Sequence, residues 1–357
     1  MGQVDNQNPS SSADVQQDAR SYFYERIGKQ KMAPLWESLH VLVSPQPLTP
    51  AVPHLWDYDG MARGYLMEAG KLITAKEAER RVLILENPGL RGLASITRSL
   101  YAGLQLVLPG EVAPAHRHTQ NALRFILEGN RAFTAVNGER TLMQPGDLVV
   151  TPAWHWHDHG NDTVGPMVWM DALDIPTVAF YGASFAEQGN AEAQTLTRPV
   201  GDSDMRYGNN LMPVDWKPEG QSSPIFNYPY ARTRDTLATM AKNGDPDACH
   251  GYKMRYVNPA TGGHITPTMS AFIQLFPNGF QTESYRSTDG TVFSVVEGTG
   301  ETRIGDMKFR WKPRDIFVVP NWMPVTHKAD GEAVLFSFSD RVAQEKLELF
   351  REARGRA

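Results

Sequence analysis

The segment PAHRHTQNALRFILEGN (residues 114–130) places several polar side chains in an otherwise apolar frame. His116 and His118 are two residues apart, and side chains at that spacing project from the same face of a β-strand. If the strand is unbroken, the same parity carries Arg124 to that face. The two histidines are therefore expected to point together into whatever the strand encloses, as ligands of one metal ion would.

A third ligand has to come from another segment, and TPAWHWHDHGN (151–161) offers three histidines of one parity: His155, His157 and His159. A His-x-His pair on a strand is by itself more often structural than metal-ligating. His155 lies between two tryptophans, which favours a structural role for it. The case for a metal site therefore depends on both segments together.

Short apolar runs surround these segments and predict a β-rich frame. Examples are LYAGLQLVL (100–108), RAFTAV (131–136) and DLVVTP (147–152). The dipeptide Asn137-Gly138 follows one such run, and Asn-Gly between apolar runs is a strong hairpin signal. Strands at this spacing indicate a sandwich or barrel, which we place at residues 83–183.

A second β-rich region, residues 250–340, repeats the first. Within PNGFQTESYRSTDGTVFSVVEG (277–298), residues 278–298 align without gaps to residues 109–129 when each is anchored on its Glu-Gly pair. Tyr285 and Ser287 then replace His116 and His118, Val325 replaces His157, and His327 aligns with His159. The second region therefore keeps the frame without the metal residues, so these residues are not needed merely to form the fold.

The remaining segments and the composition complete the outline. The 357 residues carry a formal net charge of -5, which gives no support for a nucleic-acid or anionic-membrane partner. One cysteine, Cys249, allows no internal disulfide and fits a reducing compartment, the cytoplasm. No secretory signal or membrane-spanning run is expected. We predict a disordered tail at 1–13, a helical region at 14–82, a connector at 184–249 and a C-terminal helix at 341–357.

The first repeat resembles a cupin in both halves of the family's motif. The resemblance implies that His116, His118 and His157 are the metal ligands. The glutamate that cupins frequently carry four or five residues after the second histidine is absent, because Ala122 and Leu123 stand there. The site is then a neutral three-histidine set, which leaves a divalent ion its full charge and suits an anionic chelating substrate and O₂. The matching residues are Gly110, His116, His118 and Gly129 in the first half and Gly146, Pro152, His157 and Asn161 in the second.

A narrower resemblance, to the gentisate 1,2-dioxygenase family, covers most of the chain. It is carried by HRHTQNALRFILEG (116–129), PGDLVVTPAWHWHDHGN (145–161) and WMDALDIP (169–176). It implies an all-β dominated bicupin, with two jelly-roll barrels, Fe(II) in the first barrel and none in the second. It also implies a homotetramer and extradiol-type cleavage of a 2-hydroxybenzoate by O₂ between the carboxyl- and hydroxyl-bearing carbons. For gentisate the product is maleylpyruvate.

The same resemblance assigns roles to further residues. Arg80 and Arg124 are expected to grip the substrate carboxylate, and His159 is expected to act as acid or base near the metal. Two alternatives remain open: Arg124 could form an internal salt bridge to Asp171, and His159 could bond a loop carbonyl. Gln105, His159 and Asp171 are expected to hydrogen-bond substrate or oxygen, and Tyr101 and Gly103 are expected to shape the pocket.

The resemblance specifies the aromatic ring of the substrate less strongly than it specifies the type of reaction. We expect gentisate as the substrate, with salicylate or 1-hydroxy-2-naphthoate as alternatives. Tyr101 either faces the second hydroxyl of gentisate or only packs against neighbouring side chains. A different bicupin reaction with manganese or zinc is disfavoured by the missing glutamate. A non-enzymatic bicupin that binds an aromatic acid is the third alternative, motivated by the degenerate second repeat.

Overall fold

The computed structural model describes residues 12–191 and 193–355. The chain divides into two compact units, Met1–Leu48 and Thr49–Ala357. In these described ranges no helix is both long and apolar enough to cross a membrane.

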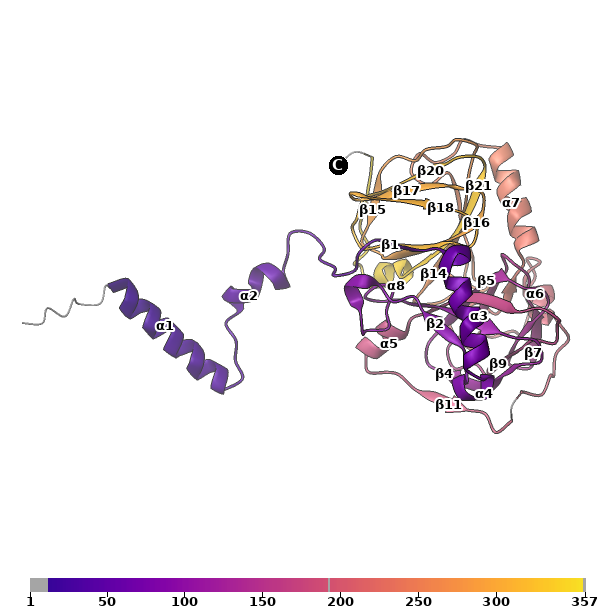
Figure 1. The fold of residues 1–357 in the computed structure, drawn as a ribbon, viewed down its shortest axis with the longest axis horizontal. Coiled ribbons are helices and arrows are strands. Elements are labelled where there is room, and N and C mark those ends of the chain that lie inside the picture. The colour runs from indigo at the N-terminus through magenta and orange to yellow at the C-terminus, as the bar shows by residue number, and fades with distance from the viewer. Residues whose placement is uncertain (1–11, 192, 356–357) are drawn as a thin grey trace, which may run out of the picture. The chain divides into compact units, whose positions relative to one another are not determined.

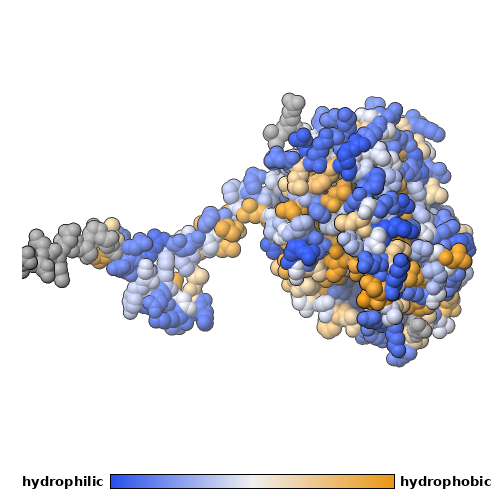
Figure 2. All heavy atoms as spheres, viewed as in Figure 1, coloured by the Kyte–Doolittle hydropathy of each residue, from blue (hydrophilic) through white to orange (hydrophobic). Residues whose placement is uncertain are grey.

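The first unit contains helices α1 (Ser12–Lys29) and α2 (Leu35–Leu42). Arg20 pairs with Glu37, and the Tyr24 hydroxyl donates to the same carboxylate at 2.6 Å. No residue of α2 is buried, and apolar residues lie at the surface of this unit (Figure 2). Most of the expected tail lies outside the described residues, but residues 12 and 13 already belong to α1.

The second unit contains two β-barrels, each made of a six-stranded and a five-stranded sheet (Figure 1). In barrel 1 the sheet orders are β12-β8-β5-β10-β3-β2 and β11-β4-β9-β6-β7. The bounds are β2 (Val82–Ile84), β3 (Tyr101–Val107), β4 (Val112–His118), β5 (Ala122–Glu128), β6 (Phe133–Val136), β7 (Glu139–Leu142), β8 (Leu148–Thr151), β9 (His157–Gly160), β10 (Met167–Leu173), β11 (Ala186–Gln188) and β12 (Asn227–Tyr228).

Barrel 2 reproduces this arrangement strand for strand, with sheet orders β1-β19-β16-β21-β14-β13 and β18-β17-β20-β15-β22. The predicted bicupin is therefore confirmed. The bounds are β1 (His54–Trp56), β13 (Tyr252–Arg255), β14 (Ser270–Phe276), β15 (Tyr285–Ser287), β16 (Thr291–Glu297), β17 (Gly300–Ile304), β18 (Met307–Trp311), β19 (Ile316–Val319), β20 (Val325–Ala329), β21 (Ala333–Ser339) and β22 (Glu352–Arg354).

The two barrels exchange their first strands. β1 precedes barrel 1 in the chain but pairs with β19 of barrel 2, and β12 precedes barrel 2 but pairs with β8 of barrel 1. Short helices also correspond, since α5 (Ile175–Phe180) follows β10 and α8 (Arg341–Lys346) follows β21. The repeat thus extends beyond the two β-rich regions predicted from the sequence, because an exchanged strand precedes each barrel and a short helix follows β10 and β21.

A tyrosine after the first exchanged strand ties the barrels together. Tyr58 opens the π-helical turn η1 (Tyr58–Ala62), which leads into α3 (Arg63–Leu72). Its backbone N–H donates to Asp315 of barrel 2 at 3.0 Å, while its hydroxyl donates to Glu128 of barrel 1 at 2.9 Å.

Tyr230 makes the equivalent bridge at the start of α7 (Tyr230–Lys242). Its backbone N–H donates to Asp147 of barrel 1 at 2.8 Å, and its hydroxyl donates to Glu297 of barrel 2 at 2.5 Å. Between the barrels, the rings of Phe125 and Phe336 stack with centroids 4.0 Å apart. These paired contacts hold the two barrels in one continuous apolar core.

Three predicted boundaries need correction. The helix expected at 341–357 ends at Lys346, and β22 pairs with β15 as β11 pairs with β4. The charged pattern of this tail is helical, but the edge of β15 offers free backbone groups that an extended tail satisfies. The region 14–82 and the connector 184–249 likewise contain strands, β1, β11 and β12, whose three or fewer residues give no periodicity to detect. Other short helices in these segments are α4 (Ala75–Ala78), η2 (Pro88–Leu90) and α6 (Asp202–Tyr207).

Candidate metal centre

The three predicted ligands come together in barrel 1. His116 and His118 lie on β4, and the antiparallel pairing of β4 with β9 sets His157 opposite His116. One ligand atom from each ring lies within 4.8 Å of the others. The centroid of the His157 ring is 4.0 Å from that of His116 and 4.8 Å from that of His118. The alternation expected from the strand thus holds for both histidines of the pair.

Backbone carbonyls fix the orientation of all three rings. Nδ1 of His116 lies 2.9 Å from the Pro114 carbonyl oxygen, and Nδ1 of His157 lies 2.9 Å from that of His155. His118 makes the same contact to the Gln120 carbonyl at 2.9 Å. A carbonyl only accepts, so each Nδ1 carries the hydrogen and each Nε2 keeps its lone pair.

Burial keeps these imidazoles neutral. Desolvation, followed by the nearby Arg80 guanidinium, lowers the pKa of His116 to about 3. Desolvation and Arg124 lower the pKa of His118 to about 4, and the pKa of His157 lies well below its ordinary value. Nε2 of His157 is buried without a hydrogen-bond partner among the described residues. Three neutral rings with converging lone pairs fit a divalent transition metal, and imidazole suits iron, zinc, copper and nickel alike.

These depressed pKa values predict a pH dependence of stability. Between about pH 6.5 and pH 4 the unfolded chain binds a proton at His118 that the folded chain does not, so stability falls as the pH falls through this window. In His118→Gln this contribution is absent. Urea unfolding of the metal-free proteins at pH 7 and pH 5 should show a smaller loss of stability in the variant, and equal losses would contradict the prediction.

Arg124 and Asp171 form an ion pair beside the histidines. Arg124 lies on β5 and Asp171 on β10, and the two are directly opposite in the strand register. Nε of Arg124 is 3.3 Å from Oδ1 of Asp171, and Nη1 donates to the Thr151 hydroxyl at 2.5 Å. The internal salt bridge left open by the sequence is therefore present. Strand β4 ends at His118 and β5 begins at Ala122. Arg124 therefore reaches the site from a separate strand, and not because side chains alternate along one unbroken strand.

The charges around the centre do not balance. Arg80 is half-buried, and the Nε atoms of Arg80 and Arg124 lack hydrogen-bond partners among the described residues. Burial raises the pKa of the Asp171 carboxyl, and Arg124 opposes this effect. Apart from the exposed Glu79 beside Arg80, two guanidinium groups thus share one carboxyl before any metal is added. A buried cationic surplus requires an anionic ligand.

Strand β3 supplies the other predicted residues. Gln105 is buried, and its Nε2 has no partner among the described residues. A Cβ at Gly103 would lie 2.5 Å from a methyl of Val82 and 2.8 Å from the Tyr101 hydroxyl. The missing side chain therefore makes room for Val82 and for the phenol of Tyr101. Desolvation raises the pKa of Tyr101, so its hydroxyl stays protonated.

His159 lies in the same interior but is not one of the three clustered ligands. Its ring centroid is 5.8 Å from that of His157, and its Nδ1 lies 2.9 Å from the Thr134 hydroxyl. The partner is thus a side chain and not the loop carbonyl that the sequence left open. Thr134 and Thr151 could not be identified from the sequence, since an isolated threonine on a strand carries no signal of its own.

The corresponding positions of barrel 2 are occupied differently. Tyr285 donates to Glu352 at 2.7 Å and accepts from Arg341 at 2.7 Å. Ser287 and Val325 are buried there. Within the described ranges the only cluster suited to a metal is the one in barrel 1.

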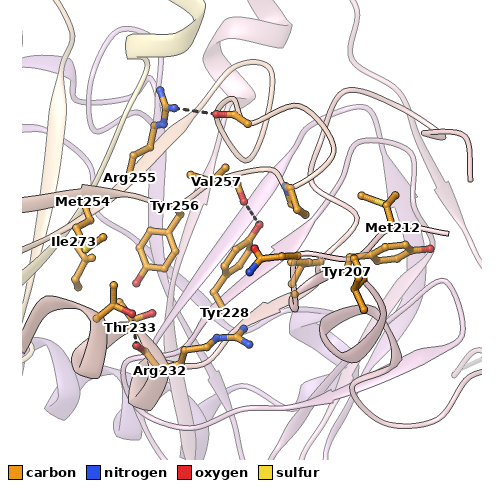
Figure 3. A pocket seen from close by; sticks show the side chains of 17 residues that line it. Tyr207, Met212, Tyr228, Arg232, Thr233, Met254, Arg255, Tyr256, Val257 and Ile273 are labelled. Atoms are coloured by element: carbon orange, nitrogen blue, oxygen red, sulfur yellow. Dashed lines mark hydrogen bonds between the residues drawn. The ribbon is translucent and has the colours of Figure 1, made fainter. Parts of the chain in front are cut away.

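A cavity of about 620 Å³ lies elsewhere, between residues 207–212, α7 and β13 (Figure 3). Tyr228 and Tyr256 contact each other edge to face there, and the Tyr228 hydroxyl donates to the Val257 carbonyl at 2.7 Å. Its lining contains none of the metal ligands. The size of this cavity therefore says nothing about the chemistry of the histidine centre.

Comparisons with known proteins agree with the fold and the site. Residues 103–175 match the family model described as a cupin domain. Over 335 residues the chain is 59% identical to gentisate 1,2-dioxygenase 1 of Aquipseudomonas alcaligenes, covering 94% of this chain and 96% of that protein. It is 36% identical to 5-aminosalicylate 1,2-dioxygenase of Comamonas sp., covering 92% of this chain and 88% of that protein.

A solved structure extends the likeness to three dimensions. Salicylate 1,2-dioxygenase from Pseudoaminobacter salicylatoxidans, solved as adducts with gentisate, matches with a TM-score of 0.89 and 32% identity. The match covers 99% of this chain and 97% of that one. The bicupin architecture, the three-histidine centre and these relatives lead to one conclusion: the chain belongs to the gentisate 1,2-dioxygenase family of ring-cleaving cupin dioxygenases.

Proposed function

We propose that this enzyme is an Fe(II)-dependent gentisate 1,2-dioxygenase that opens gentisate with O₂ between the carboxyl- and hydroxyl-bearing carbons to give maleylpyruvate. The observation that carries the proposal is the unbalanced charge of the site. Three neutral imidazoles leave a divalent ion uncompensated, and two guanidinium groups share a single buried carboxyl, that of Asp171. An ortho-hydroxybenzoate brings the negative charge and the two oxygens that such a centre can bind. The similarity to relatives named for gentisate and its analogues supports the choice of ring.

The protein's own residues bind and orient this substrate in the proposal. Arg124 is held by Thr151 and Asp171, so its remaining N–H groups are pre-positioned for a carboxylate. Arg80 adds a second positive charge from the segment before β2. Gln105 offers an unpaired amide, and Tyr101 offers a protonated hydroxyl toward the ring. Bound at the three histidines, Fe(II) would supply a Lewis-acidic, redox-active centre for O₂ activation.

Oxygen consumption tests the proposal directly. The protein loaded with Fe(II) without air and then mixed with gentisate and O₂ should consume one O₂ per gentisate and form the absorbance of maleylpyruvate. Salicylate and 1-hydroxy-2-naphthoate, offered in parallel, should turn over more slowly. Faster turnover of salicylate or 1-hydroxy-2-naphthoate would change the assigned substrate. If none of the three compounds caused oxygen uptake, the proposed reaction would be refuted. Activity with manganese or zinc alone, and none with Fe(II), would rule out iron as the cofactor.

We also propose that barrel 2 holds no metal and that the enzyme works as a homotetramer in the cytoplasm. Helix α2 supports the assembly, because it leaves large apolar side chains exposed and such surfaces often mark interaction sites. The single buried cysteine, Cys249, supports a reducing compartment. Sedimentation should give four chains per particle, and Leu39→Glu should give smaller particles. A monomer for the unaltered protein would contradict the assembly.

A further inference from the structure

His159 differs from the metal ligands in the group that its Nδ1 meets. Each ligand presents Nδ1 to a backbone carbonyl, whereas Nδ1 of His159 lies 2.9 Å from the Thr134 hydroxyl. Both side chains are fully buried. A hydroxyl can donate as well as accept, so the carbonyl argument that fixes the ligand tautomers does not apply to this ring.

Barrel 2 contains the same pair, residue for residue. Thr302 on β17 lies 2.8 Å from Nδ1 of His327 on β20, as Thr134 on β6 faces His159 on β9. There the indole Nε1–H of Trp311 donates to the Thr302 oxygen at 2.9 Å. An indole nitrogen only donates, so Thr302 accepts from it and has its own hydrogen free for Nδ1. His327 is therefore a neutral ring with its hydrogen on Nε2.

In barrel 1 the Thr134 hydroxyl has two possible acceptors for its hydrogen. Nδ1 of His159 is at 2.9 Å, and the sulfur of Met143 is at 3.3 Å. A thioether sulfur is a weak acceptor, whereas an unprotonated imidazole nitrogen is a full one. The balance favours donation to His159, as in barrel 2. The hydrogen of His159 then sits on Nε2, which is buried without a partner among the described residues.

We propose that Thr134 is a positioning residue that holds His159 as a neutral hydrogen-bond donor, with the hydrogen on Nε2, toward the substrate of barrel 1. The tautomer is opposite to that of the three ligands. A buried N–H without an acceptor is costly, so this donor needs an oxygen that arrives with the ligand. The inference deepens the proposed dioxygenase function and rests on it for the identity of that ligand. The resemblance already implies a hydrogen bond from His159 to substrate or oxygen. The inference adds which nitrogen donates it and which residue fixes that choice, and it favours a donor to a developing negative charge over an acid or base.

The duplication supplies a matched control. Thr134→Val and Thr302→Val each remove the buried threonine–histidine hydrogen bond of one barrel, and Thr302→Val also removes the acceptor of the Trp311 N–H. Both should lower the thermal unfolding midpoint and retain the metal content of the unaltered protein. Only Thr134→Val should lower kcat with gentisate, by about 10–100-fold, the range typical of outer-shell partners, with a smaller change in KM. Thr134→Ser keeps the hydroxyl and should restore most of the rate.

The tautomer itself is measured without metal or turnover. Nitrogen NMR of the metal-free protein labelled with ¹⁵N-histidine should show His159, identified by loss of its signal in His159→Asn, protonated at Nε2. In Thr134→Val it should shift toward a mixture of tautomers. Protonation at Nδ1 in the unaltered protein, or equal rates for Thr134→Val and Thr302→Val, would overturn the inference. Absence of oxygen uptake by the unaltered protein would instead refute the proposed reaction, and the NMR result would still decide the tautomer.

Discussion

Replacing His118 with alanine is expected to leave the purified protein without bound iron and without oxygen uptake. The ring contributes one of three Nε2 lone pairs whose direction is fixed by a backbone carbonyl. Loss of an outer-shell partner typically costs about 10–100-fold in metal affinity, and loss of the ligand itself should exceed that. Metal analysis after gel filtration, together with an oxygen electrode, measures both effects.

Ser287 provides the control for this substitution, because it occupies the position of His118 in barrel 2 and is equally part of a strand. Ser287→Ala should retain iron and activity. If Ser287→Ala lost the metal while His118→Ala kept it, the metal would belong to the other barrel. If both variants kept iron and activity, the histidine centre would not be the metal site at all.

Replacing Arg124 with glutamine should raise KM for gentisate by about 10–150-fold, since a hydrogen bond to a charged group contributes about 1.5–3 kcal/mol. The same change should lower the free energy of unfolding by about 3–5 kcal/mol, because the buried Asp171 carboxyl loses its ion-pair partner. The first effect reports substrate binding, and the second reports the internal ion pair.

A double substitution separates these two effects. Arg124→Gln with Asp171→Asn removes both charges, so stability should largely return while KM stays high. Steady-state kinetics and urea unfolding of the single and double variants measure this. Recovery of KM in the double variant would show that Arg124 serves only to neutralise Asp171 and does not bind the substrate.

Several features of this protein follow from the sequence alone. The spacing of His116 and His118 fixes their common face, because side chains alternate along any β-strand whatever surrounds it. The repeat predicts two similar barrels. It also shows that the second one, residues 250–340, lacks the histidines of the metal site. The resemblance to the cupin motif, carried over to this sequence, selects His157 among the three histidines of its segment. Each of these is encoded within one segment or in the comparison of two segments.

The tertiary structure alone decided which groups meet across segments. The pairing of Arg124 with Asp171 depends on the register between β5 and β10, and the bond between Thr134 and His159 depends on β6 lying beside β9. The exchanged strands β1 and β12 and the terminal strand β22 are too short to show a period. They become strands only because a neighbouring strand leaves its backbone groups unpaired. A sequence records alternation along a strand, but the partner across the sheet is set by the path of the whole chain.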